Sequence, residues 1–180
     1  DLACKLENMG ADTICIKDMA NLLLPFDAYS LVKALKAKVS VPIHLHTHNT
    51  TGTGEMTYLM AIQAGVDIID TALSPLANGT SQPATEAMVA TLQGTERDTG
   101  LDLRELQRLD NYWSDVRLRY ENFDHGLKNP TTDIYRYEIP GGQYTNLQPQ
   151  GEALGLGHRF NEVKEMYRTV NLMLGDIIKV

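Results

Sequence analysis

Three short apolar segments alternate with helical patterns through the first half of the chain. They span residues 11–18, 41–48 and 66–73, and β-branched residues are frequent in them. Runs of this kind, apolar on both faces, are typical of parallel strands buried inside a domain. Each is followed by a segment with apolar positions three and four apart, which predicts a helix. This alternation favours an α/β fold with a parallel sheet, either a barrel or a doubly wound sheet.

Start and stop signals bound the predicted helices. Gly10 ends a helix that is already under way at the first residue, which suggests a piece of a longer protein. Asp27 is a plausible N-cap for the helix predicted over 26–39, and Gly65 predicts the end of the next helix. A further helix is expected over 84–94, after a loop rich in turn-forming residues.

After residue 94 the hydrophobic pattern changes. Residues 102–123 have apolar positions along one stripe and predict a long helix, and residues 159–180 predict another. Between them, the segment 127–151 is rich in Gly, Pro, Thr and Asn, which favours ordered loop over strand. We therefore divide the chain into an α/β part, residues 1–94, and a helical extension packed on it, residues 95–180.

The composition limits the possible partners. The chain has 180 residues, a net charge of −7 and 43% hydrophobic residues, which suits one globular core. The acidic balance argues against a nucleic-acid or anionic-membrane surface, and no apolar run approaches a membrane span. Cys4 and Cys15 match neither a disulfide framework nor a zinc-ligand spacing. Because the first residues also lack a signal-peptide pattern, we expect a reducing, cytosolic location.

Three histidines fall on one face of the second predicted strand. Alternation points His44, His46 and His48 the same way, with Cα atoms about 6.5 Å apart at each step. Two such rings can converge on one metal ion with nitrogen distances of about 2.0–2.1 Å. His46 and His48 lie nearest the C-terminal end of the strand, where barrels and parallel sheets place their chemistry, so we predict that they bind metal. The alternative is two partly buried polar residues, and His44 is interpreted as a hydrogen-bonded core histidine.

Lys17 lies at the end of the first predicted strand. We expect it to point inward, where desolvation lowers the pKa of its amine. A salt bridge to a carboxylate, a Schiff-base amine and a carbamate formed with carbon dioxide are each compatible with this position. The carbamate would add an anionic oxygen ligand beside the two histidines. The spacing alone does not choose among these roles.

Four segments carry a resemblance to a known family: GADTICIKDMANLL, HLHTHNTTG, AGVDIIDTALSPLANGTSQP and YEIPGGQYTNL. In order, and over essentially the whole chain, they resemble the carboxyltransferase domain of pyruvate carboxylase. Related proteins are the oxaloacetate decarboxylase α subunit and the pyruvate-using transcarboxylase subunit. The resemblance implies the C-terminal part of a TIM (β/α)8 barrel, its last three strands, followed by a helical funnel extension. The front half of the barrel, with an aspartate ligand and substrate-holding residues, is absent from this sequence, as is the biotin carrier motif.

The resemblance also implies roles for individual residues. In that family the lysine of the KDMA motif is carbamylated and binds metal together with both histidines of HTH, which implies Lys17, His46 and His48. The threonine of the TSQP motif moves a proton between the pyruvate methyl group and the biotin ring nitrogen, which implies Thr80 as a catalytic residue. The alternative for Thr80, equally open to Ser81, is an N-terminal helix cap.

The function that the resemblance implies is carboxyl transfer between carboxybiotin and pyruvate or oxaloacetate. The cofactors would be a divalent ion (zinc, manganese or cobalt) and biotin on a separate domain or subunit. The implied partners are the biotin carrier domain, the N-terminal half of the barrel and further copies in a homo-oligomeric enzyme, located in the cytoplasm or a mitochondrial matrix. The alternatives are a metal-dependent aldolase or acyl-CoA-condensing lyase, which also uses H-x-H, and an inactive structural fragment. Asn49 stands where many relatives have aspartate, which brings a supporting hydrogen bond into question.

Overall fold

The computed structural model describes residues 1–124, 127 and 129–177, and its strands alternate with helices as predicted. The elements follow in the order α1 (Leu2–Asn8), β1 (Ile14–Asp18), α2 (Pro25–Lys36), β2 (Ile43–Thr47), α3 (Gly54–Ala64), β3 (Ile68–Ile69), η1 (Ser74–Leu76), α4 (Thr85–Leu92), α5 (Leu103–Leu118), η2 (Glu121–Phe123), α6 (Ile134–Tyr137), α7 (Gly141–Ala153), η3 (Gly157–Arg159) and α8 (Phe160–Met173).

The three strands form one parallel sheet in the order β1-β2-β3, as predicted. The third strand is shorter than the apolar run over 66–73, because only Ile68 and Ile69 pair with β2. Two residues beyond Asp70, Ala72 instead makes a parallel bridge with Ala84, just before α4. The end of this segment is therefore held by the loop that returns to the sheet.

The prediction that β1 is buried on both faces is wrong. Ile14 is buried, but Cys15 and Lys17 are exposed on the other face. The physical reason is that β1 hydrogen-bonds to a single neighbour, β2, in the described sheet, so its outer edge and one face lack a covering strand.

The hydrophobic core lies between the sheet and the helices α2, α3 and α4. Its buried members are Ile14, Ala28, Val32, Val39, Ile43, Leu45, Tyr58, Ala61, Ile62, Val66, Met88 and Leu92. The start of α2 differs from the prediction, because Leu24 is the N-cap and Pro25 occupies the first turn, where its missing N–H is harmless. Asp27 lies inside that turn, where its charge suits the helix dipole. Gly65 ends α3 in the left-handed conformation, as predicted.

The second half of the chain is helical, including a stretch that the sequence did not reveal. The predicted loop over 127–151 contains α6 and most of α7 instead. Gly141 and Pro149 favoured a loop, yet α7 includes both, with the proline inside the helix. Gly141, the first residue of α7, permits close packing on the α/β part. The prediction was wrong because Gly and Pro can serve tertiary packing as well as turns.

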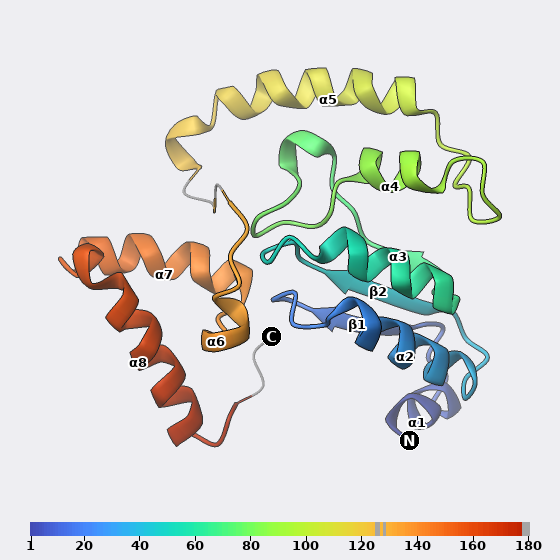
Figure 1. Ribbon diagram of the computed structural model, residues 1–180, viewed down its shortest axis with the longest axis horizontal. Coiled ribbons are helices and arrows are strands. Elements are labelled where there is room, and N and C mark those ends of the chain that lie inside the picture. The colour runs from blue at the N-terminus through green and yellow to red at the C-terminus, as the bar shows by residue number, and fades with distance from the viewer. Residues whose placement is uncertain (125–126, 128, 178–180) are drawn as a thin grey trace.

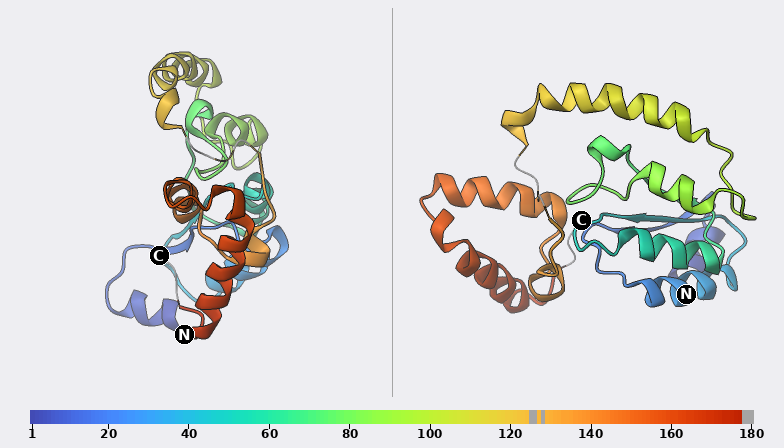
Figure 2. Two further views of the ribbon diagram at one scale, coloured as in Figure 1. Left: turned by 90° about the vertical axis from the view of Figure 1, so that its left-hand side faces the viewer. Right: turned by 45° about the horizontal axis from the view of Figure 1, so that its top comes forward.

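The helical extension lies at one end of the strands. Figures 1 and 2 show α7 and α8 beside the α/β part, with α5 running across the molecule over α4. The amide of Gly141 donates to the carbonyl of Met19, just beyond β1, so α7 begins at the C-terminal end of the sheet. The division at residue 94 stays a prediction. Among the described helices, none is both long enough and apolar enough to cross a membrane.

Candidate active site

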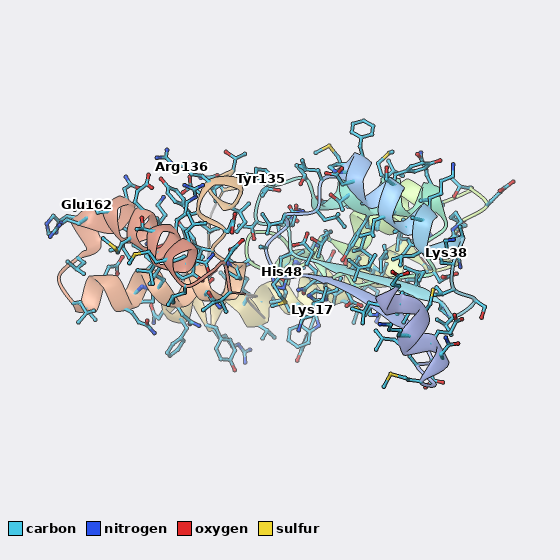
Figure 3. All side chains as sticks on the ribbon, turned by 90° about the horizontal axis from the view of Figure 1, so that it is seen from below. Lys17, Lys38, His48, Tyr135, Arg136 and Glu162 are labelled. Carbon is cyan, nitrogen blue, oxygen red and sulfur yellow. The ribbon has the colours of Figure 1, made fainter. Side chains whose placement is uncertain are left out.

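The C-terminal ends of β1 and β2 bring the predicted metal ligands together. Lys17 lies opposite His46 in the parallel register, and His48 follows directly after β2. Figure 3 shows Lys17 and His48 near each other where the α/β part meets the helical extension. Lys17, His46 and His48 thus share one face at this end of the sheet, as the strand alternation predicted.

One imidazole nitrogen of His46 is hydrogen-bonded to the protein, and the other has no partner among the described residues. Its Nδ1 lies 2.7 Å from Oδ2 of Asp70, so Nδ1 carries the proton that is donated to this carboxylate. Its Nε2 is buried and has no hydrogen-bond partner among the described residues. A buried polar atom without a partner is rare and calls for an explanation. A carboxylate on one nitrogen and a free lone pair on the other is the usual arrangement of a metal-binding histidine.

His48 is oriented in the same manner by a different acceptor. Its Nδ1 donates to the backbone carbonyl of Thr80 at 2.6 Å, which leaves Nε2 as the outward nitrogen, 3.4 Å from Nε2 of Gln82. The His46 and His48 rings stand edge to face with centroids 5.2 Å apart. Burial lowers the pKa of His48, which favours the neutral imidazole that binds metal.

Asp70 joins His44 to His46, a link that the sequence analysis missed. Its Oδ1 accepts from Nε2 of His44 at 2.8 Å while its Oδ2 holds His46. Burial alone would raise the pKa of Asp70, but the hydrogen bonds from the two histidines lower it, so the carboxylate is ionised. The buried Tyr58 of α3 places Asp70 by donating to its carbonyl at 2.6 Å and accepting from the amide of Thr47 at 3.0 Å. His44 is hydrogen-bonded, as interpreted, but only half-buried.

Lys17 differs from its prediction in burial. The side chain is exposed, so a strongly desolvated amine is not what this structure has. It lines a cleft of about 280 Å³ together with residues from the loop after β1 and from the helical extension, including Glu138 and Asp176. Among the described residues it makes no ion pair within 4 Å, so the salt-bridge alternative is wrong for these residues.

Asp18, next to Lys17, fixes the loop that follows β1. Its carboxylate accepts from the backbone amides of Ala20, Leu22 and Leu23 at 2.9–3.1 Å. It also accepts from the Thr47 hydroxyl at 3.1 Å, which ties the end of β1 to the end of β2. This clamp holds the strand end that carries Lys17 in register with the histidines.

Thr80 lies in the loop before α4 and does not cap that helix. The N-cap of α4 is Ala84, without a side-chain hydrogen bond, so the capping alternative is wrong for both Thr80 and Ser81. The Thr80 hydroxyl instead accepts from the hydroxyl of Thr145 on α7 at 3.1 Å. Its carbonyl accepts from His48, so the same residue contacts a predicted metal ligand and the helical extension.

Asn49 anchors the Thr80 loop to the end of β2. Its Nδ2 donates to Glu55 and to Asn78, each at 2.7 Å, and its Oδ1 accepts from the amide of Gly54 at 2.8 Å. Its backbone amide donates to the carbonyl of Ser81 at 2.8 Å. An aspartate could not make the two side-chain donations, so in this chain asparagine supplies the supporting hydrogen bonds that the sequence left in question.

The site supplies two imidazole nitrogens and one amine toward a common region. Within the described residues, no group of three His, Cys, Asp or Glu side chains could hold a metal ion. The partnerless Nε2 of His46, and His48 with its lowered pKa, fit a divalent ion that takes imidazole nitrogen ligands. A carbamate on Lys17, or groups outside the described residues, would complete the set of ligands.

A parallel sheet with polar side chains at its C-terminal strand ends is typical of α/β enzymes, including α/β barrels. Comparison with known protein families supports this class of enzyme. Residues 1–112 match the family described as HMGL-like, and residues 134–180 match the one described as "Conserved carboxylase domain". The chain belongs to the HMGL-like family.

Among the proteins similar to this chain are pyruvate carboxylases. Over 179 residues the chain is 51% identical to pyruvate carboxylase of Staphylococcus aureus, covering 99% of this chain and 16% of that protein. It is 50% identical to pyruvate carboxylase of Bacillus subtilis, again covering 99% of this chain and 16% of the relative. The carboxyl transferase domain of Rhizobium etli pyruvate carboxylase, solved with pyruvate, superposes with a TM-score of 0.97 at 46% identity, over 99% of this chain and 30% of that one. The predicted resemblance and the partial TIM barrel are confirmed.

Proposed function

We propose that this chain forms part of a biotin-dependent carboxyltransferase that acts on pyruvate and oxaloacetate. The observation that carries the proposal is the buried, partnerless Nε2 of His46, set beside His48 and Lys17 at the strand ends. The Thr80 hydroxyl is tied to the same region through the bond from His48 to its carbonyl. The likeness to the Rhizobium etli domain solved with pyruvate supports the choice of substrate.

His46 and His48 would hold a divalent ion through their Nε2 atoms, with Lys17 as a third ligand after carbamylation. When bound, the ion would supply Lewis-acid polarisation of the substrate's oxygen. Carbamylation requires an unprotonated amine, whose nitrogen would form an N–C bond to carbon dioxide while one N–H proton leaves to solvent. The exposed position of Lys17 on its cleft leaves the amine accessible to carbon dioxide.

Thr80 would move the proton that carboxyl transfer requires. Its Oγ1 takes a proton from the pyruvate methyl group as its own proton passes to the biotin ring nitrogen, so its protonation state is unchanged afterwards. A threonine hydroxyl is too weak a base to hold a proton for long, and simultaneous gain and loss avoids that demand. The capping role that competed with this one is absent from the structure around α4.

The rival function is that of a metal-dependent aldolase or acyl-CoA-condensing lyase on the same barrel. The HMGL-like match over residues 1–112 covers the strand ends that both classes would share. The match of residues 134–180 to the conserved carboxylase domain, and the contact of Thr145 in that segment with Thr80, favour the carboxyltransferase.

The same proposal includes partners outside this chain. They are a biotin carrier domain, the remaining strands of the barrel with their aspartate ligand, and further copies of the full enzyme. The chain spans 16% of the length of the Staphylococcus aureus relative, and we assign the proposed activity to the complete enzyme. Placement in the cytoplasm, or the mitochondrial matrix in a eukaryote, stays a prediction.

The test is steady-state carboxyl transfer by a complete carboxyltransferase polypeptide that carries this sequence. Thr80→Ala should lower the turnover rate by about 10²–10⁴-fold while metal and pyruvate binding stay nearly unchanged. Thr80→Ser keeps the hydroxyl and should retain part of the rate. A stable Thr80→Ala enzyme with near-normal turnover would remove Thr80 from the mechanism.

A further inference from the structure

The first turn of α7 packs directly against Thr80. A Cβ atom on Gly141 would lie 3.1 Å from Oγ1 of Thr50, and 3.3 and 3.4 Å from Cα and Cβ of Thr80. These distances are tighter than ordinary van der Waals contact, so the absence of a side chain at Gly141 lets the helix approach this closely. The Gly141 amide also donates to the carbonyl of Met19 beyond β1. The start of α7 thus lies against three strand-end segments, those after β1, β2 and β3.

One turn along α7, Thr145 reaches the Thr80 hydroxyl. Its Oγ1 lies 3.1 Å from Oγ1 of Thr80 and also 3.1 Å from the carbonyl of Gly141. Thr145 has one hydroxyl proton and two acceptors at equal distance. Both threonine side chains are only partly buried, so neither hydroxyl is sealed inside the core.

The two positions of this proton give the Thr80 hydroxyl two arrangements, one with a lone pair occupied by Thr145 and one with that lone pair free. When Thr145 donates to Thr80, one lone pair of Thr80 Oγ1 is occupied and its own proton is directed elsewhere, ready to be donated. When Thr145 donates to Gly141, that lone pair is free to accept. As Thr80 gives up its proton its oxygen becomes more negative, and donation from Thr145 then strengthens.

We propose that Thr145 is a positioning residue that orients and stabilises the Thr80 hydroxyl during proton transfer. The proposal rests on the proposed function of Thr80. It assigns a role to the GGQYTN segment, in which Gly141 permits the approach and Thr145 makes the contact. No bond to Thr145 is broken in the reaction other than the exchange of its hydrogen bond between two acceptors.

The test compares Thr145→Val, which keeps the shape and removes the hydroxyl, with Thr145→Ser, which keeps the hydroxyl. In a complete carboxyltransferase polypeptide carrying this sequence, Thr145→Val should lower kcat about 10- to 100-fold with KM and metal content unchanged. Its solvent isotope effect on kcat should rise, and Thr145→Ser should restore most of the rate. Thr169→Val is the matched control, because Thr169 makes the same bond to a carbonyl four residues earlier on exposed α8, away from Thr80.

Thr80→Ala and the double variant separate this proposal from the one it rests on. If both proposals hold, adding Thr145→Val to Thr80→Ala causes no further loss, because the two residues act as one unit. Full activity of Thr145→Val beside an impaired Thr80→Ala would overturn the role of Thr145 alone. If Thr145→Val lowered kcat by the same factor in the wild type and in Thr80→Ala, the role of Thr145 would also be overturned. Normal turnover by Thr80→Ala would refute the Thr80 role itself.

Discussion

Asp70 orients two histidines of β2 by accepting a hydrogen bond from each imidazole ring. One carboxylate oxygen holds His44 and the other holds His46, so the imidazole planes are fixed by a group from the neighbouring segment. Acceptors that hold the far nitrogen of a metal-binding histidine set its tautomer and increase its basicity. His48 obtains the same support from the carbonyl of Thr80, a backbone group that substitution cannot remove.

Replacing Asp70 by asparagine should weaken metal binding about 10- to 100-fold, because an amide is a poorer acceptor for His46. The measurement is a metal titration of the metal-free complete polypeptide. Asp67→Asn is the matched control: Asp67 accepts from Lys36 and from the amide of Ile43 at the opposite end of the sheet. It should lower the melting temperature and leave metal affinity intact. Unchanged affinity in Asp70→Asn would contradict the role of Asp70 in supporting His46 as a ligand.

At this scale the sequence predicted candidate ligands but not the groups that orient them. Strand alternation is a local property, so His46, His48 and Lys17 could be placed on one face from their spacing. Asp70 and Thr145 act across segments that are distant along the chain, and their partners depend on the sheet register and on how α7 packs. No local pattern encodes those contacts.

At the scale of elements, α4 and α5 are joined through two carboxyl groups. Glu86 of α4 accepts from the amide of Ser74 at 2.9 Å and hydrogen-bonds to Asp110 of α5. Burial, the hydrogen bond with Glu86 and the charge of Glu86 together raise the pKa of Asp110 to about 6 from an ordinary 3.8. Burial would also raise the pKa of Glu86, but its hydrogen bonds lower it, so the shared proton resides on Asp110.

This pair predicts a pH-dependent stability. Because the folded chain holds a proton on Asp110 that the unfolded chain releases, the contribution is complete below pH 3.8 and is lost as the pH rises through about 6. Asp110→Asn keeps a hydrogen-bond donor at every pH, so its melting temperature should fall less than the wild type's between about pH 5 and pH 7.5. Asp115→Asn, on the exposed side of the same helix, is the control. Equal pH profiles for the wild type and Asp110→Asn would contradict the shared proton.

The hydrophobic pattern predicted some of the observed elements correctly and others incorrectly. The strand–helix alternation over residues 1–94 predicted the parallel sheet, because hydrophobic burial dominates there. It gave β1 and β3 too much length and burial, since pairing depends on neighbouring strands that the pattern does not display. It missed α7, because Gly141 and Pro149 were read as turn residues although the first serves packing against Thr80.

At the scale of the whole molecule, the site lies beside an open edge of the described sheet. β1 has one strand neighbour in the described sheet, and Lys17 stands exposed on a cleft between the α/β part and the helical extension. The chain accounts for 30% of the Rhizobium etli carboxyl transferase domain that it matches. In the proposed enzyme, the remaining barrel strands cover this edge and bring the fourth metal ligand.

The proposed metal site consists of His46, His48 and Lys17, which would bind a divalent ion at the strand ends. Its most direct test is elemental analysis of the purified complete polypeptide, as the wild type and as the variants His46→Ala and His44→Ala. We expect His46→Ala to lose the bound metal. His44→Ala should keep the metal and melt at a lower temperature, because the hydrogen bond from His44 to Asp70 supports the fold. Metal content in His46→Ala equal to that of the wild type would refute His46 as a ligand.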